Sequence, residues 1–248
     1  MKYKLRRVLI SLILLGGVAW WLIVNPDSYE TEYILADSSE NQSGDFDAIA
    51  TTSADENSPL ATLVLEKIVI KGRAPKTGYS RDEFYSTWPT IDGCNLRQRI
   101  IKREMGETAV LGDDNCTVIS GEFDEPYTGA HMVYSQKSDI SKGIQIDHVV
   151  ALSDAWQKGA QNISKEDRYE LATDPLNLLA VDASTNQKKS DGDAATWLPK
   201  NKTFRCQYVA RQVSVKYKYH LWMTEAEHDA ISKVLENCPN EPAIGISL

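Results

Sequence analysis

The sequence lacks the motifs that would place it quickly in a common enzyme or metal-binding class. Its 248 residues include only four cysteines and no C-x-x-C pair, so a structural zinc knuckle is not expected. Neither the G-x-S-x-G turn of serine hydrolases nor the H-E-x-x-H helix of zinc peptidases is present. These absences disfavour a hydrolase that acts on other esters.

Basic side chains are missing from residues 25–66, which hold ten Asp and Glu. Four basic residues lie among the first seven, and without these two groups the formal net charge changes from −8 to about −2. Residues 25–57 have few large apolar side chains, so they bury too little surface to offset their ordering entropy. We expect a disordered acidic linker there, and the overall acidity does not exclude a nucleic-acid partner.

Acidic residues are absent between Asp193 and Glu225, where basic and aromatic side chains are interleaved. This composition is typical of a surface that contacts phosphates, and it is equally typical of a solvated helix. The residues concerned are Lys200, Lys202, Arg205, Arg211, Lys216 and Lys218, with Tyr208, Tyr217, Tyr219 and Trp222.

Residues 8–24 are uncharged and apolar, and they follow Lys2, Lys4, Arg6 and Arg7. At about 1.5 Å per helical residue this run is barely long enough to cross a bilayer, and it also suits the core of a signal peptide. The basic flank predicts that the amino terminus stays inside and the rest of the chain is exported. No close A-x-A cleavage site follows, so we expect a single-pass membrane anchor, with cleavage and secretion as the alternative.

The cysteines are Cys94, Cys116, Cys206 and Cys238. An even number in an exported chain favours two disulfides. Proximity along the chain pairs Cys94 with Cys116 and Cys206 with Cys238, and the other two connectivities stay open.

The order of local patterns predicts one α+β domain over residues 58–238, followed by a tail at 239–248. Ser58 and Pro59 have the residue types of a helix start. Apolar spacing then predicts a helix over residues 96–105.

Glycines and prolines divide residues 110–134 into short β-like pieces, which predict antiparallel hairpins leading to a strand that ends at His148. Ser164 begins a near capping box. Two further helices are expected over residues 208–221 and 224–235, the second capped by Thr224.

The main polar constellation lies within residues 145–193. One apolar strand ends in Asp147 and His148, and a second strand opens with Asn177 and runs directly into a polar helix with Asn186 and Lys189. Together they supply a carboxylate, an imidazole, two carboxamides and an ammonium. This set suits metal-assisted hydrolysis of a phosphodiester.

Each side chain has a plausible part in that chemistry. Asp147 and Asn186 offer the hard oxygens that Mg²⁺ or Mn²⁺ prefers. His148 points to the other side of its strand, where an imidazole can accept a proton from water. We expect Asn177 to hydrogen-bond to the loop after His148 and fix its shape. With Ser184 as N-cap, Asn186 lies in the first helical turn and Lys189 one turn later, near a bound phosphate.

Taken singly, these residues also have structural explanations. A lone histidine after an apolar strand is more often a hydrogen-bonded structural residue. Asn177 follows Pro175 closely and suits a turn, whereas Asn186 and Lys189 suit a helix surface. The joint order of strand, Asp-His, strand with Asn, and helix with Asn and Lys favours the chemical interpretation.

That order resembles the ββα-metal (His-Me finger) motif of HNH nucleases in its H-N-N variant. Three blocks resemble, more closely, exported HNH endonuclease family proteins, whose domain is shared with the carboxy-terminal nuclease domain of GmrSD-type restriction enzymes. The blocks are IDHVVALSDAW at 146–156, DPLNLLAV at 174–181 and STNQKKSD at 184–191. The likeness extends over about residues 79–238 and includes GC at 93–94, YTG at 127–129, TWLP at 196–199 and YVAR at 208–211.

The resemblance implies an α+β fold with a ββα-metal core at about residues 144–193, flanked by helices and antiparallel hairpins. It implies a Mg²⁺-type cofactor, with His148 as general base and Asp147 and Asn186 as metal ligands. It further implies that Asn177 holds the His148 loop, that Lys189 is a basic position of the helix, and that hydrolysis leaves a 5′-phosphate.

Arg97 and Arg211 lie in blocks similar to those of the family and are candidates for phosphate contact, with salt bridges as the structural alternative. Asp191 and Asp193 are candidate outer-sphere partners of the metal, with helix-end solvation as the alternative. The remaining histidines match no metal-ligand spacing and are interpreted as structural: His131, His220 and His228.

We therefore expect an exported metal-dependent endonuclease that cuts nucleic acid, DNA rather than RNA, with little sequence selectivity. The alternative is a surface module that captures nucleic acid without cutting it. Such a module would show salt-sensitive binding and no metal-dependent cleavage.

Overall fold

The computed structural model describes residues 58–135 and 143–246, all within one of the two units of the chain, Gln42–Leu248. The expected anchor at 8–24 and the acidic linker at 25–57 lie outside the described residues. Among those described, no helix is long and apolar enough to cross a membrane.

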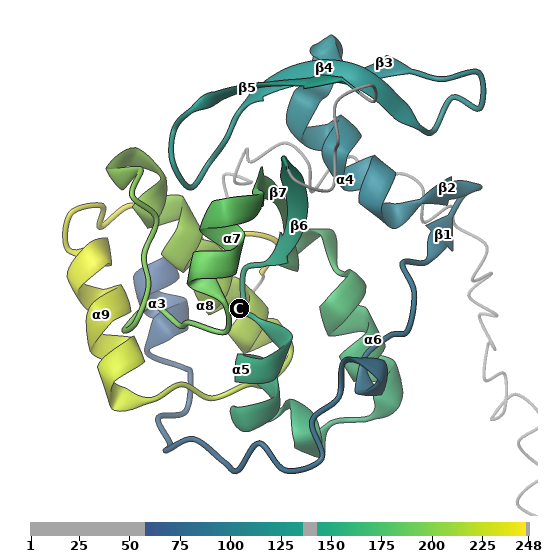
Figure 1. Ribbon diagram of the computed structural model, residues 1–248. Helices are drawn as coiled ribbons and strands as arrows, with labels where there is room; N and C mark the ends of the chain where they lie inside the picture. The colour runs from purple at the N-terminus through teal and green to yellow at the C-terminus, as the bar shows by residue number, and fades with distance from the viewer. Residues whose placement is uncertain (1–57, 136–142, 247–248) are drawn as a thin grey trace, which may run out of the picture. The chain divides into compact units, whose positions relative to one another are not determined.

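Two antiparallel strands followed at once by a helix occupy the middle of the fold (Figure 1). Strand β6 (Ile144–His148) pairs with β7 (Leu178–Asp182), and α7 (Ala183–Lys189) starts directly after β7. In this register Asp147 lies opposite Leu179 and His148 opposite Leu178. The strand–strand–helix order expected from the sequence is therefore present.

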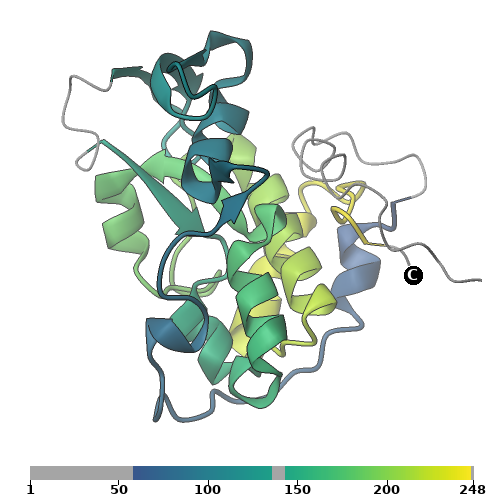
Figure 2. The same ribbon diagram turned by 90° about the vertical axis from the view of Figure 1, so that its right-hand side faces the viewer.

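Strand β7 is buried on both faces, which explains its unbroken apolar sequence. Leu178 and Ala180 pack in the same cluster as α4 (Leu96–Met105), whereas Leu179 and Val181 pack in the cluster that contains α8 (Arg205–Lys218). Figures 1 and 2 show α4 and α8 on opposite sides of the strand pair. The position of β7 is thus fixed from two directions.

On the α8 side lie α9 (Glu225–Leu235) and α3 (Ala61–Leu65). Helix α8 is buried from Tyr208 to Lys216, so it is a core helix. Both interpretations of the basic residues at 200–218, a surface that contacts phosphates and a solvated helix, are therefore wrong for Arg211 and Lys216, because these two side chains are buried.

On the α4 side lies a three-stranded antiparallel sheet in the order β3–β4–β5. The expected hairpins of residues 110–134 are confirmed. The elements here are β1 (Thr90–Ile91), β2 (Cys94–Asn95), η3 (Gly106–Thr108), β3 (Val110–Leu111), β4 (Val118–Asp124) and β5 (His131–Ser135).

Short helices surround a further core cluster around Phe84, Trp156 and Leu171. Ser80 caps the first of these helices. The elements are η2 (Arg81–Glu83), α5 (Leu152–Gln157), η5 (Ala160–Asn162), α6 (Lys165–Thr173) and η6 (Pro175–Asn177), with η7 (Lys202–Phe204) leading into α8.

Several helix starts agree with the sequence. Helix α4 covers the expected residues, Ser164 forms a capping box with Asp167 on α6, and Thr224 caps α9. Two expected caps are wrong. Asp182, which accepts the Thr185 amide, caps α7 in place of Ser184, and α3 starts after Leu60 instead of at Ser58.

The start of α3 is displaced because Leu60 forms a β-bridge with Pro242. The Ala61 amide donates to the Glu241 carbonyl, and Ala243, which is fully buried, donates its amide to Pro59. Residues 239–246, expected as a tail, therefore pack beside the first helix of the domain.

Both disulfides join the cysteines nearest in sequence. Cys94 bonds to Cys116, and Cys206 at the start of α8 bonds to Cys238 after α9. The pairing expected from proximity is confirmed.

Six charged side chains from five parts of the chain meet in the interior, and we call them the ion cluster: Arg73, Asp154, Lys158, Asp193, Lys216 and Glu227. Lys158 is fully buried, and its ammonium lies 2.7 Å from Asp154, 2.7 Å from Asp193 and 2.6 Å from Glu227. Burial acts to raise the pKa of Asp193, but Lys158 and Arg73 outweigh it and lower that pKa to about 2. Three cations and three anions make the cluster neutral, and it joins α5, α8 and α9.

Replacing Lys158→Met should lower the free energy of unfolding by about 3–5 kcal/mol, because it leaves one buried carboxylate charge uncompensated. Urea denaturation followed by circular dichroism measures the change. The control is Lys218→Met, which breaks a partly exposed pair with Asp174 and should cost about 1 kcal/mol or less. Equal losses in the two variants would contradict a special role for the ion cluster.

Candidate functional site

His148 is the last residue of β6, and its ring is buried between aromatic neighbours. Trp88 stacks nearly parallel to it, at 9° and with 6.0 Å between ring centroids. Its Nε2 lies 2.9 Å from the Ala172 carbonyl oxygen, which can only accept, so Nε2 carries the proton and Nδ1 keeps a lone pair. Burial, and next the charge of Arg81, lower the pKa of His148 to about 3. The imidazole is neutral at pH 7 and has one nitrogen able to accept a proton.

Asn177 fixes the backbone that follows His148. Its side-chain oxygen accepts the Val150 amide at 2.8 Å, and its own carbonyl accepts the Val149 amide at 2.8 Å. Its amide group donates to the Leu171 carbonyl at 3.1 Å. The contact expected from the sequence is present, although Asn177 ends η6 instead of opening β7.

Asp147 is buried, and two side chains hold its carboxylate. The Tyr127 hydroxyl donates to Oδ2 at 2.5 Å, and the Lys189 ammonium lies 2.9 Å from Oδ2 and 3.1 Å from Oδ1. Lys189 also donates to the His148 carbonyl at 2.8 Å, and its side chain has no exposed surface. The expectation that Lys189 contacts phosphate therefore does not agree with its position, because its charge is used inside the protein.

Asn186 lies on the first turn of α7, near Gln145 at the start of β6. Its amide group donates to Gln145 Oε1 at 2.9 Å, so its amide oxygen points elsewhere. Among the described residues, no hydrogen bond to that oxygen is formed. It is a free oxygen donor at the edge of the site.

Asp147, His148 and Asn186 line one open pocket with a volume of about 460 Å³. Lys76, which precedes η2, and Arg81, the first residue of η2, line the same pocket. The structure thus brings three of the expected site residues to one pocket. Asn177 and Lys189 are buried beside it, where Asn177 contacts the loop after His148 and Lys189 contacts Asp147 and the His148 carbonyl.

Two residues that line this pocket carry oxygen donors of the kind that a hard divalent cation binds. Asp147 has a carboxylate, both oxygens of which contact Lys189, and Asn186 has an amide oxygen that accepts no hydrogen bond within the described ranges. Asp191, which lines the pocket, accepts from Ser153 at 3.1 Å and pairs with Lys76 at 3.4 Å. Although burial acts to raise the pKa of Asp191, these two contacts lower it, so this carboxylate is ionised as well.

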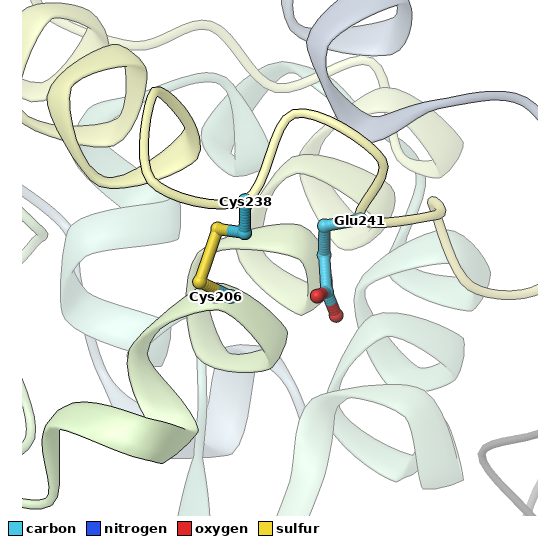
Figure 3. A group of neighbouring side chains, drawn as sticks. All are labelled: Cys206, Cys238 and Glu241. Carbon is cyan, nitrogen blue, oxygen red and sulfur yellow. A yellow bond between two sulfur atoms is a disulfide. The ribbon is translucent and has the colours of Figure 1, made fainter.

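A different group of close ligand atoms has no metal-binding capacity. Cys206, Cys238 and Glu241 lie near one another, as Figure 3 shows. The two sulfurs are bonded to each other, so neither is a thiolate that binds an ion.

Arg97 and Arg211, expected at a phosphate-contacting surface, donate to backbone carbonyls instead. Arg97 is half-buried and contacts the Ile144 carbonyl, whereas Arg211 is buried and contacts that of Leu176. Burial lowers the pKa of both and that of Arg211 to about 10. Their expected phosphate contact is not supported. Asp193, a candidate outer-sphere partner, belongs to the ion cluster.

Sequence reasoning missed Tyr127, Lys76 and Arg81. Tyr127 lies in the YTG block that carried the resemblance, so a signal was present at that position. Lys76 and Arg81 precede His148 by more than 60 residues, and no spacing rule connects them to it.

Comparison with known proteins places the site within a described family. Residues 97–234 match the model of the family described as GmrSD restriction endonucleases, C-terminal domain. An uncharacterized secreted protein of Arthroderma benhamiae (strain ATCC MYA-4681 / CBS 112371) is 36% identical over 181 residues, which cover 72% of this chain and 84% of that protein. No solved structure matches the chain. The matched range contains β6, β7 and α7 but not Lys76 or Arg81.

Replacing Asn177→Ala should lower the free energy of unfolding by about 1–3 kcal/mol, because it leaves buried backbone groups without partners. Amide exchange at Val150 should accelerate, and hydrogen exchange read by NMR measures this directly. The exposed Asn237, whose side chain bonds the Lys233 carbonyl, gives a matched control as Asn237→Ala. Unchanged exchange at Val150 would show that Asn177 does not hold the loop.

Proposed function

The chain belongs to the family of C-terminal domains of GmrSD restriction endonucleases, and from this we propose that it is a metal-dependent endonuclease of the HNH type. Its ββα-metal core consists of β6, β7 and α7. The observation that carries the proposal is that three residues line one pocket: His148, which has a neutral imidazole, and Asp147 and Asn186, which have oxygen donors.

His148 is the general base of the proposed reaction. Its Nδ1 takes the proton of a water molecule whose oxygen attacks phosphorus, while the bond from phosphorus to the 3′ oxygen breaks. The products are a 5′-phosphate and a 3′-hydroxyl, which gains a proton. The Ala172 carbonyl keeps the ring in the required tautomer, and Asn177 keeps the following loop in place.

Asp147 and Asn186 would hold Mg²⁺ or Mn²⁺. When bound, such an ion neutralises negative charge that grows on the phosphate and on the departing oxygen. Tyr127 and Lys189 keep the Asp147 side chain oriented. Lys189 therefore acts on the metal ligand and does not itself contact phosphate.

The proposed substrate is nucleic acid, DNA rather than RNA, cut with little sequence selectivity. Two disulfides and a secreted relative support export. Residues 8–24 remain the proposed membrane anchor, with cleavage and secretion as the alternative.

Replacing His148→Ala should abolish Mg²⁺- or Mn²⁺-dependent nicking of plasmid DNA, since the site then has no base. His148→Gln is the sharper variant, because its amide still donates to Ala172 but offers no basic nitrogen. An agarose-gel nicking assay gives the rate, and thermal unfolding shows whether the fold is retained.

The control for both variants is His131→Ala, at an exposed histidine on β5. Full activity of His148→Gln would remove the proposed base. Salt-sensitive DNA binding by the wild-type chain, with no cleavage in any metal, would instead support the alternative of a non-catalytic binding module.

Replacing Asn186→Ala should weaken Mn²⁺ binding by at least about 10-fold, because it removes one oxygen ligand. Isothermal titration calorimetry measures the affinity without reference to activity. The exposed Asn162 of η5 supplies the control Asn162→Ala. Equal Mn²⁺ affinity in the wild type and Asn186→Ala would exclude Asn186 as a ligand.

A further inference from the structure

We propose that Arg81 binds a phosphate of the nucleic-acid backbone in the pocket beside His148. The identity of the ligand as nucleic acid rests on the proposed function. The contact itself follows from the position, support and charge of this guanidinium.

Arg81 is the first residue of η2, directly after the capping residue Ser80. It lines the pocket that contains Asp147, His148 and Asn186. Its guanidinium lies over the ring of Tyr85, which is itself a neighbour of the His148 ring. A phosphate held by Arg81 would thus lie near the proposed base.

Tyr85 holds the guanidinium in place. The Arg81 Nη2 donates to the Tyr85 hydroxyl at 2.7 Å, and the guanidinium lies over the Tyr85 ring at 5.3 Å. The Tyr85 ring is in turn 6.1 Å from that of His148. Because a neutral hydroxyl is the partner, the orientation of Arg81 is fixed while its charge is not neutralised.

No carboxylate within the described ranges forms an ion pair with Arg81. The neighbouring Lys76 differs, because it is paired with Asp191. The planar fork of arginine suits two phosphate oxygens at once, and only one of its N–H groups is occupied by Tyr85.

Three other cations considered for phosphate contact are not available. Lys189 has its charge used by Asp147, and Arg97 and Arg211 donate to backbone carbonyls. Arg81 is therefore the exposed, unpaired guanidinium of the pocket. It lies outside residues 97–234, so it comes from a segment that the family match does not cover.

The experiment measures binding separately from cleavage. Fluorescence anisotropy of a labelled DNA duplex, in chelator and over a series of salt concentrations, gives the affinity and its salt slope for the full chain. Arg81→Ala should bind about 10-fold more weakly and lower the slope by about 1, as expected for one lost phosphate contact. Arg81→Lys should keep the slope and show an intermediate affinity, because the charge remains but the fork is lost.

Two controls make the result specific. Lys67→Ala removes the same charge at an exposed position outside the pocket and should leave binding unchanged. Tyr85→Phe keeps the charge and removes the hydroxyl that orients it, so it should weaken binding by a smaller factor with the same slope. Thermal unfolding is recorded for each variant, and Arg81→Lys decides the question if Arg81→Ala does not fold.

Unchanged affinity and slope in Arg81→Ala would overturn the proposal, as would a wild-type chain that binds neither a DNA nor an RNA duplex. The proposed function fails differently. If His148→Gln cuts DNA at the wild-type rate while Arg81→Ala loses binding, the general base is wrong and the phosphate contact stands.

Discussion

The ammonium of Lys189 joins the last turn of α7 to the end of β6, and the geometry of the pocket depends on this buried contact. It touches both the Asp147 carboxylate and the His148 carbonyl, so the two adjacent residues that carry the proposed chemistry are held by one charge. Burial of an ammonium without an anionic partner is costly, so the contact with Asp147 is needed to hold Lys189 in the interior. The same contact turns the Asp147 side chain toward α7. Asn186, one turn earlier on the same helix, is brought to the pocket by the same contact.

Two cations near this site have different roles. Lys189 is buried, and Asp147 neutralises its charge, so it stabilises the structure of the site. Arg81 lines the pocket, where a neutral hydroxyl holds it and its charge is not neutralised. These two side chains come from distant parts of the chain, α7 and η2. Residues 97–234, which match the family model, include α7 but begin after Arg81.

Features that depend on neighbouring residues could be predicted from the sequence. The strand ending at His148, the helix over residues 96–105, the caps at Ser164 and Thr224 and the two disulfides all follow from local patterns or short separations. The contact of Asn177 could be foreseen because strand pairing brings the two strand ends together. Three features could not be predicted: the burial of Lys189 and Arg211, the ion cluster, and the position of Arg81 in the pocket beside His148. Each depends on which elements pack against one another, and the sequence around a charged residue does not indicate whether that residue is buried.

The bridge between Leu60 and Pro242 places the beginning and the end of the described fold side by side. When the two ends of a domain lie close together, the domain can be inserted into a loop of another protein with little disturbance of that protein's structure. Such a module can be spliced into another protein, or carried behind a tether, without any rearrangement of its interior.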